Sequence, residues 1–428
     1  METRRQHSED SPTPTISRGS NTGSCTSTNR IQNPDPIPND LIMEILSRSP
    51  AKSVARCLCL SKFWASTLRS RGFTDLFVTK SSARPRILFS FRENGKLVFY
   101  SAPQIQNQDE NSILVAAKHH MVFRFDCSEL CRPLRGLVCL TYLRVVSAST
   151  KNTVPVIWNL TTGHSLSLPK VKTRRVGVKS FFGFDPIGKQ FKVLCMTSTV
   201  YWKESCVEHQ ILTLGTKKLS WKMIDCSIPH YPLSGGICIN GCVYYHALVH
   251  EAHDVKRHPF VPPPSVPGIV CFDVRSESFR FINKAEDMLV TEVRHPTLAD
   301  YKGKLSVLSS DGFEYVTGES SCLELWVLQD AEQHQWSKHI YLVPTMLKNV
   351  VARTVLYFVG VTGTDEIVLS PQYKSDLVLS VQHIPDQFYV FYYNIEKNTI
   401  RRVEIQGMIR DRRRIHISLD HVENVNIL

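Results

Sequence analysis

Residues 268–282 read GIVCFDVRSESFRFI, an apolar run that reaches a polar turn and leaves it on alternating apolar residues. Alternation with a period of two is typical of strands, so the stretch predicts two antiparallel strands joined by a tight turn. The same arrangement occurs four more times along the 428-residue chain, starting at Pro155, His209, Leu323 and Phe388. Successive copies start 54, 59, 55 and 65 residues apart, which indicates an internal repeat.

A second recurring element lies between these hairpins and predicts one more hairpin in each repeat. Each repeat then contains four strands, and four-stranded sheets at a period of roughly 50 residues are typical of a β-propeller of kelch type. The copies are GLVCL at 136–140, FFGFDPIGKQFKVLCM at 181–196, GGICINGCVYYHAL at 235–248, DYKGKLSVLS at 300–309 and LYFVGVTGTDEIVLS at 356–370.

The two ends of this β-region predict how the propeller closes. NGKLVFYS at 94–101 indicates one further blade, which gives about six blades, with seven as the open alternative. The final IHISLDHVENVNIL at 415–428 is expected to supply a closing strand to the first blade, so that no sheet edge stays unpaired. The expected fold class is therefore α + all-β in two domains, a small helical domain over residues 37–80 followed by a propeller over residues 85–426.

The first 36 residues differ from the rest in composition. They are rich in Ser, Thr, Pro and Asn, and their aliphatic residues are Ile16 and Ile31. Such a segment buries too little apolar surface to offset the entropy cost of ordering the chain. A disordered tail is therefore predicted for residues 1–36.

Helical periodicity begins at Ile37 and predicts a short bundle of three helices that ends near Ser70. Pro50 ends the first helix and suits the start of the second, where a missing amide hydrogen costs nothing. A unit this small cannot cover all of its apolar side chains, so a docking surface is predicted; the alternative is that these side chains pack onto the propeller. The apolar spacing runs through Leu41, Ile42, Ile45, Leu46, Val54, Cys57, Leu58, Leu60, Trp64 and Leu68, and Lys52, Arg56 and Lys62 border it.

The order I-P-x-D-L-I-x-E-I-L, then P-A-K-S-V-A-R and C-L-S-K-x-W, resembles the F-box of plant F-box proteins over residues 37 to about 77. In that family the F-box is a small helical bundle that docks on the Skp adaptor of an SCF ubiquitin ligase. One difference is Ser49-Pro50 where the family usually has Leu-Pro, and loss of a central leucine costs roughly 2–4 kcal/mol. The resemblance implies that adaptor binding uses Ile37, Pro38, Leu41, Ile45, Leu46, Pro50, Leu60 and Trp64.

The β-region has a family resemblance of its own. FFGFDPIGKQFKVLCM, GGICINGCVYYHAL, LYFVGVTGTDEIVLS and the terminal LDHVENV are similar to the F-box associated domain of land plants, over roughly residues 85–426. The resemblance implies a non-catalytic substrate-recognition adaptor, which binds a client protein and reaches cullin through a Skp-like adaptor. It implies no cofactor and does not identify the client. Two alternatives stay open, a scaffold or decoy with a drifted F-box and a receptor that binds a small molecule at the propeller centre.

Composition excludes several other classes of protein. No run of 18 apolar residues exists, so no membrane span is expected, and without a secretory signal the protein is expected in the nucleus or cytoplasm. The net charge of +12 fits an acidic partner, but no basic run is interleaved with aromatic residues, so nucleic-acid binding is not expected. The basic clusters at 170–175 and 410–414 are interpreted as solvated turns, the second with nuclear import as its alternative.

Several possible sites have a simpler structural interpretation. His246, His250, His253 and Asp254 lack the HExxH order, so we expect a solvent loop here and no metal site. Cys127 with Cys131, and Cys238 with Cys242, have spacings that predict core thiols. GVTGTDE at 360–366 lacks the lysine of a phosphate-binding loop and predicts a hairpin turn, and GxSxG is absent. The longest loop is predicted at 249–267, where VPPPSVP is a stiff connector or a proline-rich ligand.

Overall fold

The computed structural model describes residues 37–94, 96–105, 112–123, 127–145, 151–173, 177–198, 208–227, 229–250, 265–288, 296–351, 354–371, 387–408 and 415–426. The described residues from Asp40 onward belong to one compact unit. The predicted disordered tail lies outside the described residues, as do the basic cluster at 410–414 and most of the proline-rich loop. Among the described helices, none has the length and apolarity that a membrane span requires.

In the part of the chain that the structure describes, four helices precede the strands, so the predicted end of the bundle near Ser70 is wrong. Ser70 is the N-cap of a fourth helix, and its side-chain oxygen accepts a hydrogen bond of 3.2 Å from the backbone N–H of Phe73. The fourth helix has a weak sequence signal because Gly72 and several β-branched residues lower its helix propensity. The helices are α1 (Asn39–Ser47), α2 (Ala51–Cys57), α3 (Lys62–Leu68) and α4 (Arg71–Ser82).

The helices share a small apolar core that includes a residue from the far end of the sequence. Phe73 and Phe77, four residues apart on α4, are fully buried, and their ring centroids lie 6.1 Å apart. Val425 packs into the same cluster. The helical core is therefore completed by a residue of the C-terminal segment. The buried cluster consists of Ala51, Val54, Leu68, Phe73, Phe77 and Val425.

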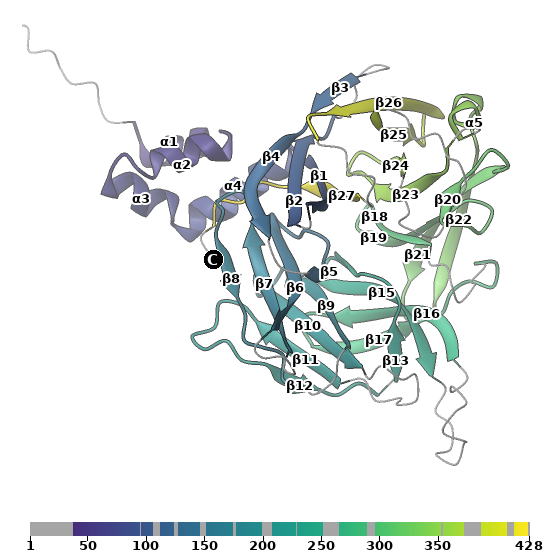
Figure 1. The fold of residues 1–428 in the computed structure, drawn as a ribbon, viewed down its shortest axis with the longest axis horizontal. Helices are drawn as coiled ribbons and strands as arrows, with labels where there is room; N and C mark the ends of the chain where they lie inside the picture. The colour runs from purple at the N-terminus through teal and green to yellow at the C-terminus, as the bar shows by residue number, and fades with distance from the viewer. Residues whose placement is uncertain are drawn as a thin grey trace, which may run out of the picture. The chain divides into compact units, whose positions relative to one another are not determined.

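The strands form six sheets, which are the six blades of a β-propeller (Figure 1). The predicted four-strand repeat is confirmed, and the blade count is six. Blades one to three are β27 (His416–His421), β1 (Arg86–Glu93), β2 (Lys96–Pro103) and β4 (Ala117–Phe123); β5 (Cys127–Leu130), β6 (Leu137–Val145), β7 (Lys151–Asn159) and β8 (Ser165–Ser167); and β9 (Gly177–Asp185), β10 (Gln190–Ser198), β11 (Glu208–Thr213) and β12 (Lys222–Ile224).

The other three blades follow the same order, with short additional strands. A last helix, α5 (Thr345–Val351), lies between blades five and six. Blades four to six are β13 (His230–Pro232) with β14 (Ile237–Ile239), β15 (Cys242–His250), β16 (Ser265–Asp273) and β17 (Ser278–Ile282); β18 (Thr297–Tyr301), β19 (Lys304–Ser309), β21 (Cys322–Asp330) and β22 (Gln335–Leu342); and β20 (Tyr315–Val316), β23 (Leu356–Val361), β24 (Glu366–Pro371), β25 (Phe388–Asn394), β26 (Thr399–Gln406) and β3 (Ser112–Val115).

The ring is closed by the C-terminal strand, as the sequence predicted. Strand β27 pairs antiparallel with β1, with Phe89 opposite Ile417 and Leu88 opposite Ser418, and Figure 1 shows the two strands side by side. A second connection was not predicted: β3, from the segment between β2 and β4, pairs parallel with β26 of blade six. Blades one and six are therefore joined at both the inner and the outer part of the sheets.

An Asp or Asn side chain at the end of the third strand of a blade accepts hydrogen bonds from the turn that follows. This explains why the hairpin sequence pattern recurs along the chain. The Asp273 carboxylate accepts hydrogen bonds from the backbone N–H groups of Arg275 (2.9 Å) and Ser276 (2.8 Å). This arrangement is an Asx turn, in which a short Asp or Asn side chain fixes the chain reversal. The equivalent acceptors in blades two, five and six are Asn159, Asp330 and Asn394.

The antiparallel order divides the connections between two faces of the propeller. Turns from the first to the second strand and from the third to the fourth lie on one face, which we call the turn face. Connections from the second to the third strand, and from blade to blade, lie on the opposite face, which we call the loop face. Asp75 of α4 forms an ion pair with Lys189 of a turn-face hairpin in blade three (3.1 Å), so α4 contacts the turn face.

Of two predicted connections, the loop around His246 is corrected by the structure and the turn in GVTGTDE is confirmed. The predicted solvent loop around His246 is wrong for that residue, because His246 lies in β15, is 1% exposed and hydrogen-bonds through Nε2 to the Pro296 carbonyl (2.8 Å). His253 and Asp254 lie outside the described residues. The predicted turn in GVTGTDE is confirmed, since the Thr362 N–H donates to the Glu366 carbonyl (2.9 Å) between β23 and β24.

After β27 the chain crosses from blade one to blade two through a buried set of hydrogen bonds. The Asn159 amide nitrogen donates to the carbonyls of Asn424 and Asn426, both at 2.9 Å. The Asn424 amide in turn donates to the Arg135 carbonyl (2.7 Å). Gly136 has a φ of +83°, and a Cβ there would lie 2.4 Å from the Asn424 Cβ, so only glycine permits this close approach.

We expect Asn159→Ala to lower the free energy of unfolding by about 2–3 kcal/mol, because it leaves buried carbonyl and N–H groups without partners. Asn394→Ala is the matched control, since Asn394 occupies the same turn position in blade six and its described contact is one backbone N–H, that of Lys397. The control is expected to cost less than about 1 kcal/mol. Urea unfolding of both variants measures the difference, and equal losses would show that the contacts with the C-terminal segment contribute nothing.

Candidate functional site

The helices expose several large apolar side chains. Leu41 is 55% exposed, Ile45 58%, Leu60 69% and Phe63 48%, and we call these four the exposed apolar set. Leu41 and Ile45 lie four residues apart on α1, so they share one face of that helix. Exposed apolar residues this closely spaced in sequence are typical of a surface that another protein covers.

The opposite side of the helices is used for packing. Met43 and Leu46 of α1 are half-buried and pack against the buried cluster around Phe73 and Phe77. Helix α1 therefore has one apolar face turned to the core and another turned to solvent, more apolar surface than its own bundle covers.

The eight residues predicted for adaptor binding fall into two groups. Leu46 and Trp64 are half-buried and pack against the bundle core, so a contact with a partner would be secondary to their packing role. Phe63 was not predicted; its ring packs edge-to-face on Trp64 with centroids 6.1 Å apart. The exposed positions are Ile37, Pro38, Leu41, Ile45, Pro50 and Leu60.

A sequence signal for Phe63 was available. Phe63 follows Leu60 by three residues and is the second residue of α3, immediately before Trp64. Spacing alone, however, does not show that Trp64 packs against the core while Phe63 stays exposed, because both positions fit an apolar helix pattern.

The α1 helix is held by charged and polar contacts at its C-terminal end. Glu44 contacts Lys80 of α4 (2.9 Å) and Arg48 (2.5 Å), and hydrogen bonds from Lys80 first, then Arg48, lower the pKa of its carboxyl. The Arg84 guanidinium donates to the carbonyls of Arg48 and Ser47. These donors satisfy carbonyls that lack partners at a helix end, so the direction of α1 is fixed relative to α4.

Ser49, the residue that differs from the usual leucine, has a local role here. Its hydroxyl donates to the Ile45 carbonyl at 3.1 Å, and the side chain is half-exposed. Ser49 therefore contributes to the end of α1 and leaves the buried cluster intact. Lys52, Arg56 and Lys62 are exposed beside the apolar residues, as expected.

The predicted core thiols agree with the structure to different degrees. Cys131 is buried, and burial contributes to a raised pKa of its thiol, after the hydrogen bond with Cys139. Burial raises the pKa of Cys238 to about 11. Cys127 and Cys242 are half-buried and pack against apolar clusters.

One group of possible metal ligands lies among the described residues of blades three and four. His209, Cys226 and His230 each place one ligand atom within 4.8 Å of the other two. Sequence spacing does not indicate this group, because His209 lies on β11, Cys226 in the connection to the next blade and His230 at the start of β13. Its chemistry is considered below.

Comparison with known proteins assigns both parts of the chain. The F-box domain family matches residues 36–76, and the F-box associated beta propeller domain family matches residues 86–422. The chain is similar to three Arabidopsis thaliana proteins: F-box protein DOR, 46% identical over 93% of this chain and 96% of the relative; F-box protein At5g65850, 43% over 94% and 93%; and F-box protein At3g61340, 43% over 92% and 93%. F-box proteins of this kind are adaptors and are generally non-catalytic. The chain therefore belongs to the F-box proteins that carry an F-box associated β-propeller domain.

Proposed function

We propose that this protein is a substrate-recognition adaptor of an SCF-type ubiquitin ligase. The helices dock on a Skp-like adaptor, and through it on cullin, while the propeller holds a client protein. The observation that carries the proposal is the exposed apolar set in a segment that matches the F-box. Catalysis lies with other subunits, and the proposed role needs no cofactor.

The exposed apolar set supports docking on a partner because burying it contributes favourable free energy. Burying one Leu, Ile or Phe side chain contributes about 1.5–3 kcal/mol relative to leaving it in water. Four such side chains supply about 6–12 kcal/mol when fully buried from water, a range that includes the roughly 8 kcal/mol of a micromolar complex, before the entropy cost of association is subtracted. Exposed Lys52, Arg56 and Lys62 provide a basic border that favours an acidic partner surface.

The loop face is the proposed client site. The turn face is partly occupied, because α4 contacts blade three through Asp75 and Lys189 and the C-terminal segment crosses blade two. The loop face carries the longer connections between second and third strands, including those between β15 and β16 and between β24 and β25. Loops that differ in length among blades are where a propeller acquires specificity.

Phe313 is the described side chain best placed to test the loop face. It lies in the connection between β19 and β21, is 45% exposed and stacks on Tyr315 with ring centroids 5.4 Å apart. An exposed aromatic ring that stacks on a half-buried neighbour is typical of an anchor in a protein interface.

Bound in this way, the client stays near the ubiquitin-charged enzyme of the ligase. Tethering converts a bimolecular encounter into a nearly intramolecular one and raises the effective concentration of the client lysines. The contribution of this protein is therefore to select the client and to hold it near the charged enzyme.

We expect Ile45→Ala to weaken binding of a purified Skp-like adaptor roughly 10- to 30-fold, because the substitution removes an apolar contact from the interface. Ile340→Ala is the matched control, since Ile340 on β22 is the same residue type and is also 58% exposed. Isothermal titration calorimetry with the full chain measures both. Leu41→Ala should behave like Ile45→Ala.

An unchanged affinity for Ile45→Ala and Leu41→Ala would contradict this docking surface. If the wild-type chain itself shows no affinity for a Skp-like adaptor, the scaffold or decoy role replaces the ligase role. Circular dichroism of each variant shows that the fold is retained, as expected for substitutions at exposed positions.

We expect Phe313→Ala to reduce recovery of a ubiquitin-bearing client roughly 10-fold while recovery of the Skp-like adaptor stays unchanged. The measurement is affinity purification from plant tissue with the proteasome inhibited, followed by quantitative mass spectrometry. Ile187→Ala is the control, because Ile187 is 69% exposed in a turn-face hairpin of blade three. Loss of the client with Ile187→Ala, but not with Phe313→Ala, would place the client on the turn face.

A further inference from the structure

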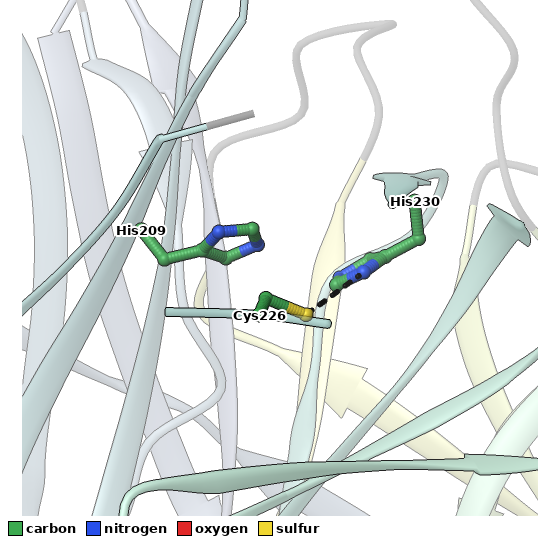
Figure 2. A group of neighbouring side chains, drawn as sticks. All are labelled: His209, Cys226 and His230. Carbon is green, nitrogen blue, oxygen red and sulfur yellow. Dashed lines mark hydrogen bonds between the residues drawn. The ribbon is translucent and has the colours of Figure 1, made fainter. Parts of the chain in front are cut away.

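Three side chains with metal-binding chemistry converge between blades three and four. Figure 2 shows the rings of His209 and His230 approaching each other from opposite sides, with the Cys226 thiol between them. His209 is 5% exposed, His230 is fully buried and Cys226 is half-buried. The Cys226 sulfur lies 3.8 Å from Nδ1 of His230.

These distances suit a small tetrahedral ion. In a zinc site with bonds of about 2.3 Å to sulfur and 2.0–2.1 Å to nitrogen, the ligand atoms are roughly 3.3–3.6 Å apart. The Cys226–His230 separation is already near this value, and all three ligand atoms lie within 4.8 Å of one another. Adjustments of about 1 Å in side-chain position would complete the geometry.

The ring of His230 is already oriented for this role. Its Nε2 lies 2.8 Å from the hydroxyl oxygen of Tyr245, which is fully buried on β15. When Nε2–H donates to that oxygen, the lone pair of the neutral ring is on Nδ1, the atom that faces Cys226. Metal-binding histidines typically donate their second ring N–H to an outer partner in this manner.

The surroundings are apolar and aromatic. The Phe279 ring on β17 lies 4.9 Å from the His209 ring and 5.8 Å from the His230 ring, centroid to centroid. An apolar shell limits access of water and strengthens the bonds between a cation and a thiolate. The combination of one thiolate and two imidazoles is a ligand set for zinc, which needs no redox change to bind.

We propose that His209, Cys226 and His230 bind one zinc ion, with a solvent molecule as the fourth ligand. Binding replaces the thiol proton of Cys226, which is released to solvent, and joins β11 of blade three to the segment that begins blade four. All three residues lie at the loop face, since β11 follows a second-to-third-strand connection and Cys226 lies in a blade-to-blade connection. Zinc would therefore order the proposed client face without taking part in adaptor docking.

The test starts from the full chain prepared free of metal. Titration with zinc against a chromophoric chelator is expected to give one ion per chain. Cobalt, used as a spectroscopic substitute, is expected to give tetrahedral visible bands and a thiolate-to-metal charge-transfer band. Failure to bind one equivalent of zinc in competition with the chelator overturns the proposal.

Variants separate this site from the other thiols of the chain. Cys226→Ser and His209→Asn should weaken zinc binding at least about 100-fold, and Tyr245→Phe about 10-fold. Cys59→Ser is the control, because Cys59 is an exposed thiol in the turn between α2 and α3, and it should leave zinc binding unchanged. Cys226→His should restore zinc binding while the cobalt charge-transfer band stays absent.

Circular dichroism shows whether each variant is folded. If Cys226→Ser does not fold, Cys226→His still tests the site, because it is expected to bind zinc without a cobalt–thiolate band. Equal zinc affinity in the wild type and Cys226→Ser overturns the proposal, as does a cobalt spectrum without a thiolate band. Adaptor binding of the zinc-free chain is expected to be unchanged, so failure of the zinc proposal and failure of the adaptor role give different results.

Discussion

Pairing of β27 with β1 is the constraint on which the other parts of the structure depend. A propeller removes its sheet edges only when the first and last blades meet, because an unpaired edge exposes a row of backbone N–H and C=O groups. Here the inner strand of blade one comes from residues 416–421, while its other three strands come from residues 86–123. The parallel pair of β3 with β26 adds a second connection between the same two blades.

Closure also determines where the helices are held. The residues that follow β27 continue into the helical core: the Glu423 N–H donates to the Ser81 hydroxyl (2.8 Å), its carboxylate accepts from the Ala51 N–H (3.2 Å), and Val425 is buried with Phe73 and Phe77. The same segment is fixed to blade two by Asn159 and Asn424. The C-terminal segment thus completes both the propeller ring and the helical core. The apolar residues that remain exposed on α1 are those that pack against neither.

The predictable parts of the fold are those with a local cause. The hairpins follow from strand alternation around residues such as Asp273, whose side chain fixes the turn within three residues. The closing strand was predictable because a strand-like segment was left over after the blades had been counted. In contrast, the burial of His246 depends on Pro296, and the burial of Val425 depends on Phe73, contacts between residues far apart in the sequence that no local pattern reveals. Helix α4 was missed because its propensity is weak and its two buried phenylalanines provide most of its stability.

The candidate site shows the same limit. The pattern on α1 correctly indicated more apolar surface than a small bundle covers, but it did not separate Leu41 and Ile45, which face solvent, from Leu46, which packs inward. That division depends on where α4 and the C-terminal segment lie, which only the folded chain shows. His209, Cys226 and His230 were missed for a related reason, since the propeller brings β11 next to the connection after β12 and the start of β13, and no spacing rule joins these segments.

The place of Val425 in the helical core has a consequence for how the protein is made. Residues 51–77 leave the ribosome more than three hundred residues before the valine that completes their core. The core of the nascent helices therefore lacks Val425 until the whole propeller has been translated. A product of premature termination would lack both the last inner strand and this valine, so neither its ring nor its helical core would be complete.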